Sequence, residues 1–412
     1  MSGFFRSRWV QAPAHAREAD PAALPLGFRA AGVSAGLKSS GPDVAVLASD
    51  EPGTVSAARF TSNARVGAPV TVSRGARLNG LRAVVANSGG SNTGDGERGL
   101  ATARAMQART AELLDVETDQ VGVASTGVIG SELPREQVLM GIEEACRALG
   151  PDADHLSRAI LTSDSGPKRA CLEVELDAGP VRVAAQAKGA GMISPRYATM
   201  FCFLQTDAAL EADTLDLLTG VCVKRSFDRI SVDGQLSTSD TVFALASGGA
   251  GVRVEPEGRD ELLLGEAIDA LMRQLAVDIA ADGEGAERVG RVIVRGRAEA
   301  VEPVARAVAD SPLVKTALHG ADPNFGRILQ AAGAAFEPRD PFVVDLEIQG
   351  RQVVSAGEAI PLEPDEMAAL EGAMREPEVD FELTLPGEGG ETEVIFSDLS
   401  ETYVEFNSKY TT

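Results

Sequence analysis

Residue types that mark several common protein classes are scarce in this chain. It has 3 histidines and 4 cysteines in 412 residues, and aromatic residues make up only 4%. The histidines form no H-E-x-x-H motif and the cysteines form no C-x-x-C pair, so we expect neither a metal site nor a disulfide framework. Scattered thiols in a chain of this length indicate a reducing compartment, the cytoplasm. These residues are His15, His155, His319, Cys146, Cys171, Cys202 and Cys222.

Long apolar runs are absent too, and basic residues are few. No stretch of about 18 uninterrupted apolar residues occurs, which argues against a membrane-spanning helix. The N-terminal segment MSGFFRSRWVQAPAHAREAD has no apolar core of a secretory signal. With 38 Lys and Arg against 61 Asp and Glu, the formal net charge is −23. That charge repels nucleic acids and anionic lipid surfaces, whereas a small anionic substrate needs only a local cation.

The remaining composition is that of a globular protein with a sizeable core. Hydrophobic residues make up 44% of the chain and charged residues 24%. Strand-like apolar runs and helical periodicity are mixed along the sequence, which predicts an α/β or α+β fold. The predicted elements include strands over 43–48, 70–72 and 81–86, helices over 97–114, 137–149, 262–281 and 300–318, and an irregular segment over 1–25.

Three familiar catalytic motifs match by spacing alone. GVSAG at 32–36 has the spacing of a nucleophile elbow, but its flanks supply neither the apolar strand nor the helix that an elbow needs. The glycines at 89–94 have P-loop spacing, with Asp95 where a phosphate-binding lysine belongs. SGPK at 165–168 fits S-x-x-K, but Gly-Pro disfavours the required helical turn. We expect none of the three to be catalytic.

A different nucleophile candidate lies beyond the glycine-rich segment that begins at Lys188. Thr199 stands directly before the apolar run MFCFLQTD. A loop before a core strand is a purely structural explanation of this pattern. A chain with so few histidines also needs another base for a hydroxyl nucleophile, and a threonine freed by chain cleavage has its own α-amine. An α-amine titrates near ~8, closer to neutral pH than lysine at ~10.4, which suits a general base.

The segment AKGAGMISPRYATM at 187–200 resembles the self-cleavage motif of the ornithine acetyltransferase family, the bifunctional glutamate N-acetyltransferases of arginine biosynthesis. Further family blocks follow the same order along nearly the whole chain. They are GFRAAGVSAGLKSSG, NSG…TG, STGVIG, ILTSDSGPK, VDGQLSTSDT, DGEGA, SPLVKTALHGADPNFGR and the terminal FNSKYTT. The chain departs from the family pattern in its glycine-rich loop at 87–96, in Thr162-Ser163, and in Arg196 and Tyr197 beside the expected cut.

The resemblance implies a two-lobed fold of layered sheets flanked by helices, in an N-terminal-nucleophile-like arrangement. It implies self-cleavage between Ala198 and Thr199. The products would be an N-terminal fragment, 1–198, and a C-terminal fragment, 199–412, which begins with the nucleophile. Two such pairs would assemble as α2β2.

The family's functional positions also transfer to this sequence. Thr199 would be the nucleophile, and Thr126 and Gly127 would form the oxyanion hole. Substrate-binding positions fall on Thr162, Lys188, Thr199, Glu284, Asn407 and Thr412. The implied reaction is ping-pong acetyl transfer from N2-acetyl-L-ornithine to L-glutamate with no metal or cofactor, and acetyl-CoA is a further acetyl donor in some members.

Three alternatives stay open at this point. An autoprocessed N-terminal-nucleophile aminopeptidase or amidase would hydrolyse peptides in place of transferring acetyl groups. A paralogue would use a different acyl acceptor, and the departures at Arg196 and Tyr197 leave room for one. A degenerate homologue acting as a binding or scaffold protein would not cleave itself, and the retained Thr199 and Thr126 argue against it.

Overall fold

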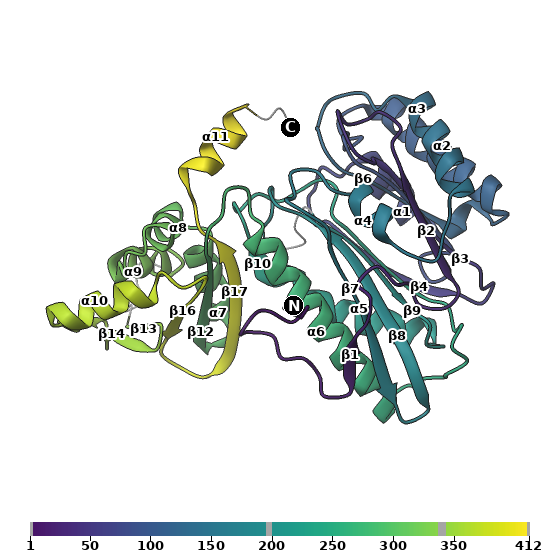
Figure 1. Cartoon of the computed structure of the whole chain (residues 1–412). Helices are drawn as coiled ribbons and strands as arrows, with labels where there is room; N and C mark the ends of the chain where they lie inside the picture. Colours follow the sequence, from purple (N-terminus) through teal and green to yellow (C-terminus); the bar gives the residue numbers. More distant parts are fainter. Residues whose placement is uncertain (1–2, 195–199, 337–342, 410–412) are drawn as a thin grey trace.

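The computed structural model describes residues 3–194, 200–336 and 343–409, and these form two lobes (Figure 1). The first lobe contains two sheets packed face to face between helices, and the second contains one sheet with its own helices. The predicted two-lobed architecture of layered sheets flanked by helices is therefore confirmed. Among the described residues, no helix has both the length and the apolar character needed to cross a membrane.

The larger sheet of the first lobe has, in the described part of the chain, the strand order β1-β7-β8-β9-β11-β4. Lys188 on β8 lies opposite Phe201 on the antiparallel β9, and β9 runs parallel to β11. Strands from both sides of the expected cut between 198 and 199 are thus neighbours in one sheet. The strands are β1 (Ala16–Glu18), β4 (Val55–Phe60), β7 (Lys168–Leu176), β8 (Gly179–Lys188), β9 (Phe201–Thr206) and β11 (Thr241–Ala246).

The smaller sheet of this lobe has the strand order β2-β3-β5-β6. Its strands are β2 (Phe28–Val33), β3 (Val44–Ser49), β5 (Ala83–Asn87) and β6 (Val121–Ser125). Helices α5 (Ala212–Arg225) and α6 (Arg259–Ala281) cover the outer face of the larger sheet, and α2 (Gly96–Leu114) and α3 (Arg135–Arg147) cover the smaller one. The shorter helices α1 (Ala68–Arg74) and α4 (Asp154–Ala159) pack at its edges.

The central strands are buried on both faces, which explains their continuous apolar sequences. In β9, Phe201 and Phe203 face the smaller sheet, whereas Cys202 and Leu204 face the helices α5 and α6. Successive side chains of a strand point to opposite faces, so a strand between two layers must be apolar at every position. The result is a four-layer lobe in which two sheets lie between two layers of helices.

The second lobe has the strand order β10-β17-β12-β16-β13-β14-β15 in the described residues. These strands are β10 (Ile230–Ser231), β12 (Val289–Arg297), β13 (Asp345–Ile348), β14 (Arg351–Ser355), β15 (Glu358–Ala359), β16 (Glu378–Thr384) and β17 (Gly389–Ser397). Its helices are α7 (Ala298–Ala309), α8 (Pro312–His319), α9 (Phe325–Gly333) and α10 (Pro364–Ala373). The last helix, α11 (Glu401–Lys409), follows β17 and extends away from this sheet (Figure 1).

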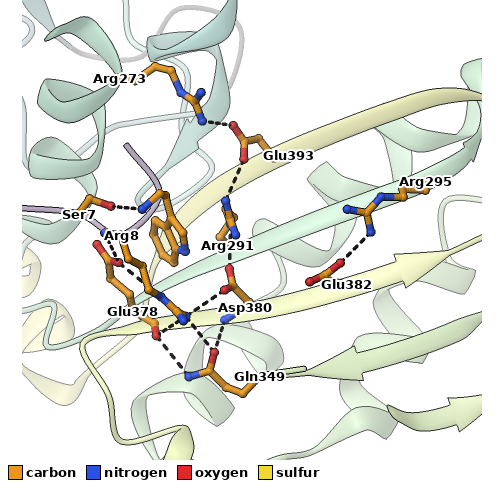
Figure 2. A network of polar contacts seen from close by, with 11 residues as sticks. Ser7, Arg8, Arg273, Arg291, Arg295, Gln349, Glu378, Asp380, Glu382 and Glu393 are labelled. Atoms are coloured by element: carbon orange, nitrogen blue, oxygen red, sulfur yellow. Dashed lines mark hydrogen bonds and ion pairs between the residues drawn. The ribbon is translucent and has the colours of Figure 1, made fainter. Parts of the chain in front are cut away.

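A chain of alternating charges joins the lobes (Figure 2). Arg8 of the N-terminal segment lies 2.9 Å from Asp380 on β16, which also binds Arg291 on β12 at 2.7 Å. Arg291 reaches Glu393 on β17 at 3.6 Å, and Glu393 binds Arg273 on α6 at 2.7 Å. Because Arg8 and Arg273 belong to the first lobe, the network fixes the second lobe at two points.

Three local predictions are wrong. The predicted strand over 70–72 is part of α1, where Pro69 occupies the first turn and Val70 is buried. The single helix predicted over 300–318 is split into α7 and α8, because Ser311 caps a new helix by accepting the backbone N–H of Val314. Part of the predicted irregular segment over 1–25 is the edge strand β1, which pairs with β7.

Candidate active site

A cavity of about 160 Å³ brings together the described residues that the resemblance singled out. The predicted residues that line it are Thr126, Gly127, Thr162, Lys188, Glu284 and Asn407. Ala198, Thr199 and Thr412 lie outside the described residues. The cavity is also lined by residues that the sequence analysis did not assign, among them Ser163, Asp233 and Tyr403.

Thr126 and Gly127 are placed by the parallel strands β5 and β6. Asn87 lies opposite Ser125 in this pair, so the chain leaves both strands at the same edge, and the backbone N–H of Thr126 donates to the Asn87 carbonyl at 3.0 Å. Gly127 has a φ of +122°, and a Cβ there would lie 2.6 Å from the carbonyl carbon of Gly89. The glycine-rich loop after β5 therefore packs backbone to backbone against Gly127, which leaves no room for a side chain.

Lys188 is the buried cation of the cavity, with 2% of its surface exposed. Its Nζ donates to Thr126 Oγ1 at 3.1 Å and lies 5.9 Å from the centre of the Phe201 ring, within the range of a cation–π contact. Burial lowers the pKa of Lys188, and the neighbouring carboxylate of Asp164 opposes that shift. The lysine gives the threonine hydroxyl a fixed hydrogen-bond donor and the cavity a positive end.

A buried carboxylate connects this lysine to the next loop. The Asp164 side chain is fully buried, lies 2.7 Å from Lys168 Nζ, and accepts the backbone N–H groups of Gly189 at 2.6 Å and Thr162 at 3.1 Å. Burial alone would raise the pKa of Asp164, but Lys168, Lys188 and these hydrogen bonds outweigh it and lower the pKa to about 2. Asp164 therefore stays ionised and fixes the backbone on two sides of the cavity.

Glu284 is held on the opposite side of the cavity, just after α6. Its carboxylate accepts hydrogen bonds from Ser163 Oγ at 2.6 Å and from Asn407 Nδ2, on α11, at 2.8 Å. A Cβ on Gly191 would lie 2.5 Å from a Glu284 oxygen, so the glycine of the AKGAG segment allows this close approach. The cavity thus has a cationic and an anionic side.

Several residues of the site were missed by the sequence analysis. Lys168 binds both Asp164 and Asp282, which stands two residues before Glu284. Asp233 and Tyr403 line the cavity and are joined by a 3.3 Å hydrogen bond from the phenol. Single Asp, Lys and Tyr residues show no periodicity, so no local pattern marks them. The signal that could have found them is their position in or beside the family blocks ILTSDSGPK, DGEGA, VDGQLSTSDT and FNSKYTT.

The rejected motifs have other roles in this structure. GVSAG at 32–36 begins in β2 and continues towards β3, so no helix follows the serine. Lys168 of SGPK binds carboxylates instead of Ser165. His15 binds the Leu263 carbonyl and His319 binds Asp398. Within the described residues, no group of three or more His, Cys, Asp or Glu side chains is arranged to hold a metal ion.

Comparison with known proteins identifies the family. The profile of the ArgJ family matches residues 29–412. The chain belongs to the ArgJ family. The arginine biosynthesis bifunctional protein ArgJ of Symbiobacterium thermophilum is 42% identical over 396 residues, covering 94% of this chain and 98% of that protein. The ArgJ protein of Rhodopirellula baltica is 40% identical over 401 residues, with 94% and 96% covered.

A solved structure is also similar to this chain. It is ornithine acetyltransferase of Mycobacterium tuberculosis, complexed with ornithine. It is 32% identical, with a TM-score of 0.41, and the match covers 45% of this chain and 99% of that one. The family resemblance drawn from the sequence motifs is confirmed by the ArgJ profile and relatives, and this ArgJ-family chain is accordingly an acyltransferase of arginine biosynthesis.

Lys168 lies between two carboxylates, Asp164 and Asp282, and this arrangement predicts the effect of removing the lysine charge. Lys168→Met leaves Asp164 and Asp282 without their shared partner, and we expect the free energy of unfolding to fall by about 3–5 kcal/mol. Urea unfolding at neutral pH measures this loss. Lys409→Met is the matched control, because Lys409 is 71% exposed and its ion-pair partner Glu405 is 68% exposed, and it should change stability by less than about 0.5 kcal/mol.

The same measurement repeated at lower pH checks the cause. The pKa of Asp164 in the folded chain, about 2, lies below its unfolded value of about 3.9, so the ionised group stabilises the fold above about pH 4. Its contribution is lost as the pH falls towards 2. The difference between wild type and Lys168→Met should therefore shrink on acidification, and a difference independent of pH would contradict this explanation.

Proposed function

We propose that this chain transfers the acetyl group of N2-acetyl-L-ornithine to L-glutamate through an acetylated Thr199. The observation that supports this proposal most directly is the cavity, where Thr126, Gly127 and Lys188 face Glu284 and Asn407. An amino-acid substrate carries charges of both signs, and the cavity offers the buried cation of Lys188 and the carboxylates of Glu284 and Asp233. The name of the Mycobacterium tuberculosis relative, ornithine acetyltransferase, and its complex with ornithine support the same substrate.

Self-cleavage is the first step of the proposed mechanism. The Thr199 hydroxyl attacks the Ala198 carbonyl, the peptide C–N bond breaks, and the acyl group moves to the oxygen, which frees the α-amine of Thr199. Water then hydrolyses the ester, which restores the Thr199 hydroxyl and leaves Ala198 with a carboxylate. The described residues after the cut are well anchored, since the Met200 N–H donates to Asp240 at 3.0 Å. Fragments 1–198 and 199–412 should stay together, because β8 and β9 remain paired. We propose that two such pairs form the α2β2 assembly.

Acetyl transfer then proceeds in two halves. The α-amine of Thr199 takes the hydroxyl proton as the oxygen attacks the acetyl carbonyl, and it returns a proton to the leaving ornithine amine. The negative oxygen that develops is stabilised by the Thr126 hydroxyl and the Gly127 N–H. Lys188 donates to Thr126 Oγ1, so the hydroxyl hydrogen is free to point at that oxygen. In the second half, the amine of glutamate attacks the carbonyl of acetyl-threonine and the Thr199 oxygen leaves. The α-amine of Thr199 carries a proton from the attacking amine to the leaving oxygen, and the product is N-acetylglutamate.

The word bifunctional in the names of the ArgJ relatives supports a second donor, acetyl-CoA, for glutamate acetylation. The proposed chemistry uses the chain's own groups and no metal or cofactor. We place the enzyme in the cytoplasm, where its four free cysteines stay reduced.

The mechanism predicts that the purified chain cleaves itself. Denaturing mass spectrometry should resolve fragments 1–198 and 199–412, whereas Thr199→Ala should remain one chain without transferase activity, because the attacking hydroxyl is gone. In native conditions the two wild-type fragments should elute together. Efficient acetyl transfer by an uncut wild-type chain would contradict the mechanism, and hydrolysis of peptides without transfer would favour the aminopeptidase alternative.

The oxyanion role predicts that Thr126→Val lowers kcat by about 100- to 1,000-fold. Thr126→Ser keeps the hydroxyl and should retain most of the activity, which makes it the matched control. Valine also leaves Lys188 Nζ without its acceptor, so the thermal midpoint must be measured beside the kinetics. Equal activity losses in the valine and serine variants would exclude the hydroxyl as the stabilising group.

The charge of Glu284 predicts a difference between the two substrates. Glu284→Gln removes the partner of the ornithine side-chain ammonium, and we expect KM for acetylornithine to rise about 10- to 100-fold. KM for glutamate should change much less, and self-cleavage should continue. Steady-state kinetics with each substrate varied in turn measures the effect. A uniform loss for both substrates would show that Glu284 supports the fold or the nucleophile.

A further inference from the structure

Asp233 joins separate segments beside the cavity, and the proposed mechanism assigns it no role. It lies in the loop between β10 and β11. Its Oδ2 accepts the backbone N–H of Met192 at 2.7 Å and the hydroxyl of Tyr403 at 3.3 Å. Its Oδ1 accepts the N–H of Ile193 at 2.9 Å and that of Gln235 at 3.0 Å. One carboxylate therefore binds both sides of the cavity.

The first side is the backbone that precedes the expected cut. Met192 has a φ of +56°, in the left-handed region that non-glycine residues rarely adopt. Such a conformation persists only where the surroundings hold it. Here the carboxylate of Asp233 binds two consecutive N–H groups, and the Ile193 carbonyl in turn accepts the N–H of Val232 at 2.9 Å. The loop around Asp233, which belongs to the expected C-terminal fragment, thus binds the backbone of residues 192–193.

The second side is the helix α11, which has no buried residue. It meets the cavity through Tyr403 and Asn407, four residues apart and therefore on one face of the helix. The Tyr403 hydroxyl binds Asp233, and Asn407 binds Glu284. Burial and the nearby Asp233 raise the pKa of the Tyr403 phenol, which keeps its proton available for donation. Fixing Tyr403 fixes the position of Asn407.

We propose that Asp233 is a positioning residue that sets two parts of the site together, the backbone at 192–193 and the helix that carries Asn407. The inference rests on the proposed function, in which the backbone at 192–193 serves self-cleavage and the helix with Asn407 serves acetylornithine binding. Neither part touches the other directly in the contacts described above. The carboxylate is their common partner.

Two substitutions separate the two links. Asp233→Asn keeps Oδ1 as the acceptor for the Ile193 and Gln235 N–H groups. It places an NH2 group opposite the Met192 N–H, so that hydrogen bond is lost. The Tyr403 hydroxyl can rotate and accept from the new amide, so its link is kept. This variant should slow self-cleavage by about tenfold. Tyr403→Phe leaves the backbone at 192–193 bound and should raise KM for acetylornithine about fivefold, with normal self-cleavage.

A matched control is Ser408→Ala, which removes a hydroxyl that donates to the Glu405 carbonyl of the same helix. It should leave cleavage and KM unchanged. A readout free of activity is hydrogen exchange of the amides at 401–409, measured in chains that also carry Thr199→Ala. Tyr403→Phe should accelerate this exchange, and Ser408→Ala should not.

The proposal is overturned if Tyr403→Phe leaves both KM and the exchange at 401–409 as in wild type. It is also overturned if Asp233→Asn cleaves at the wild-type rate, or if both variants lose thermal stability with unchanged KM and cleavage. If Asp233→Asn does not fold, Tyr403→Phe alone decides. A wild-type chain that neither cleaves nor transfers would refute the proposed function instead, and the exchange measurement would still decide whether Asp233 positions α11.

Discussion

Lys168 and Lys188 lose their water in this fold, and the buried carboxylate of Asp164 pairs with Lys168 and opposes the desolvation of Lys188. Burying ions without a partner costs several kcal/mol each, so the cavity depends on this arrangement. Asp164 also binds the backbone N–H groups of Thr162 and Gly189. The Asp164 carboxylate therefore both balances the buried charge and holds the loops in place. A change that moves this carboxylate must affect both.

The rest of the site depends on strands and helices that come from both sides of the expected cut. Lys188 ends β8, and its neighbour β9 begins just after the expected cut, so the sheet itself would hold the two fragments together. The helix with Asn407 comes from the second lobe, whose position is fixed by the charge chain that runs from Arg8 to Arg273 (Figure 2). The proposed cleavage would therefore free a new N-terminus without releasing either fragment.

The first lobe was largely predictable because strands buried on both faces must be apolar throughout, as in β3 and β9. In the second lobe the strand β12 (VGRVIVRGR) could not be predicted from periodicity, since glycines and arginines interrupt its apolar positions. The strand predicted over 70–72 failed because Pro69 and tertiary packing outweigh the preference of valine for strands. Motif resemblance located Thr126 and Glu284, but the contact of Asp233 with Tyr403 joins residues 170 positions apart and leaves no local pattern.

A single cavity that accepts both proposed substrates must tolerate opposite charges at one end. In the proposed reaction, ornithine would bring an ammonium to Glu284, whereas glutamate would bring a carboxylate to the same place. Glu284 is bound by two donors, the Ser163 hydroxyl and the Asn407 amide. These donors reduce the negative potential while the site is empty, and each can bind the glutamate carboxylate directly. In the proposed reaction, discrimination between the substrates would therefore be decided by the hydrogen-bond donors around one carboxylate.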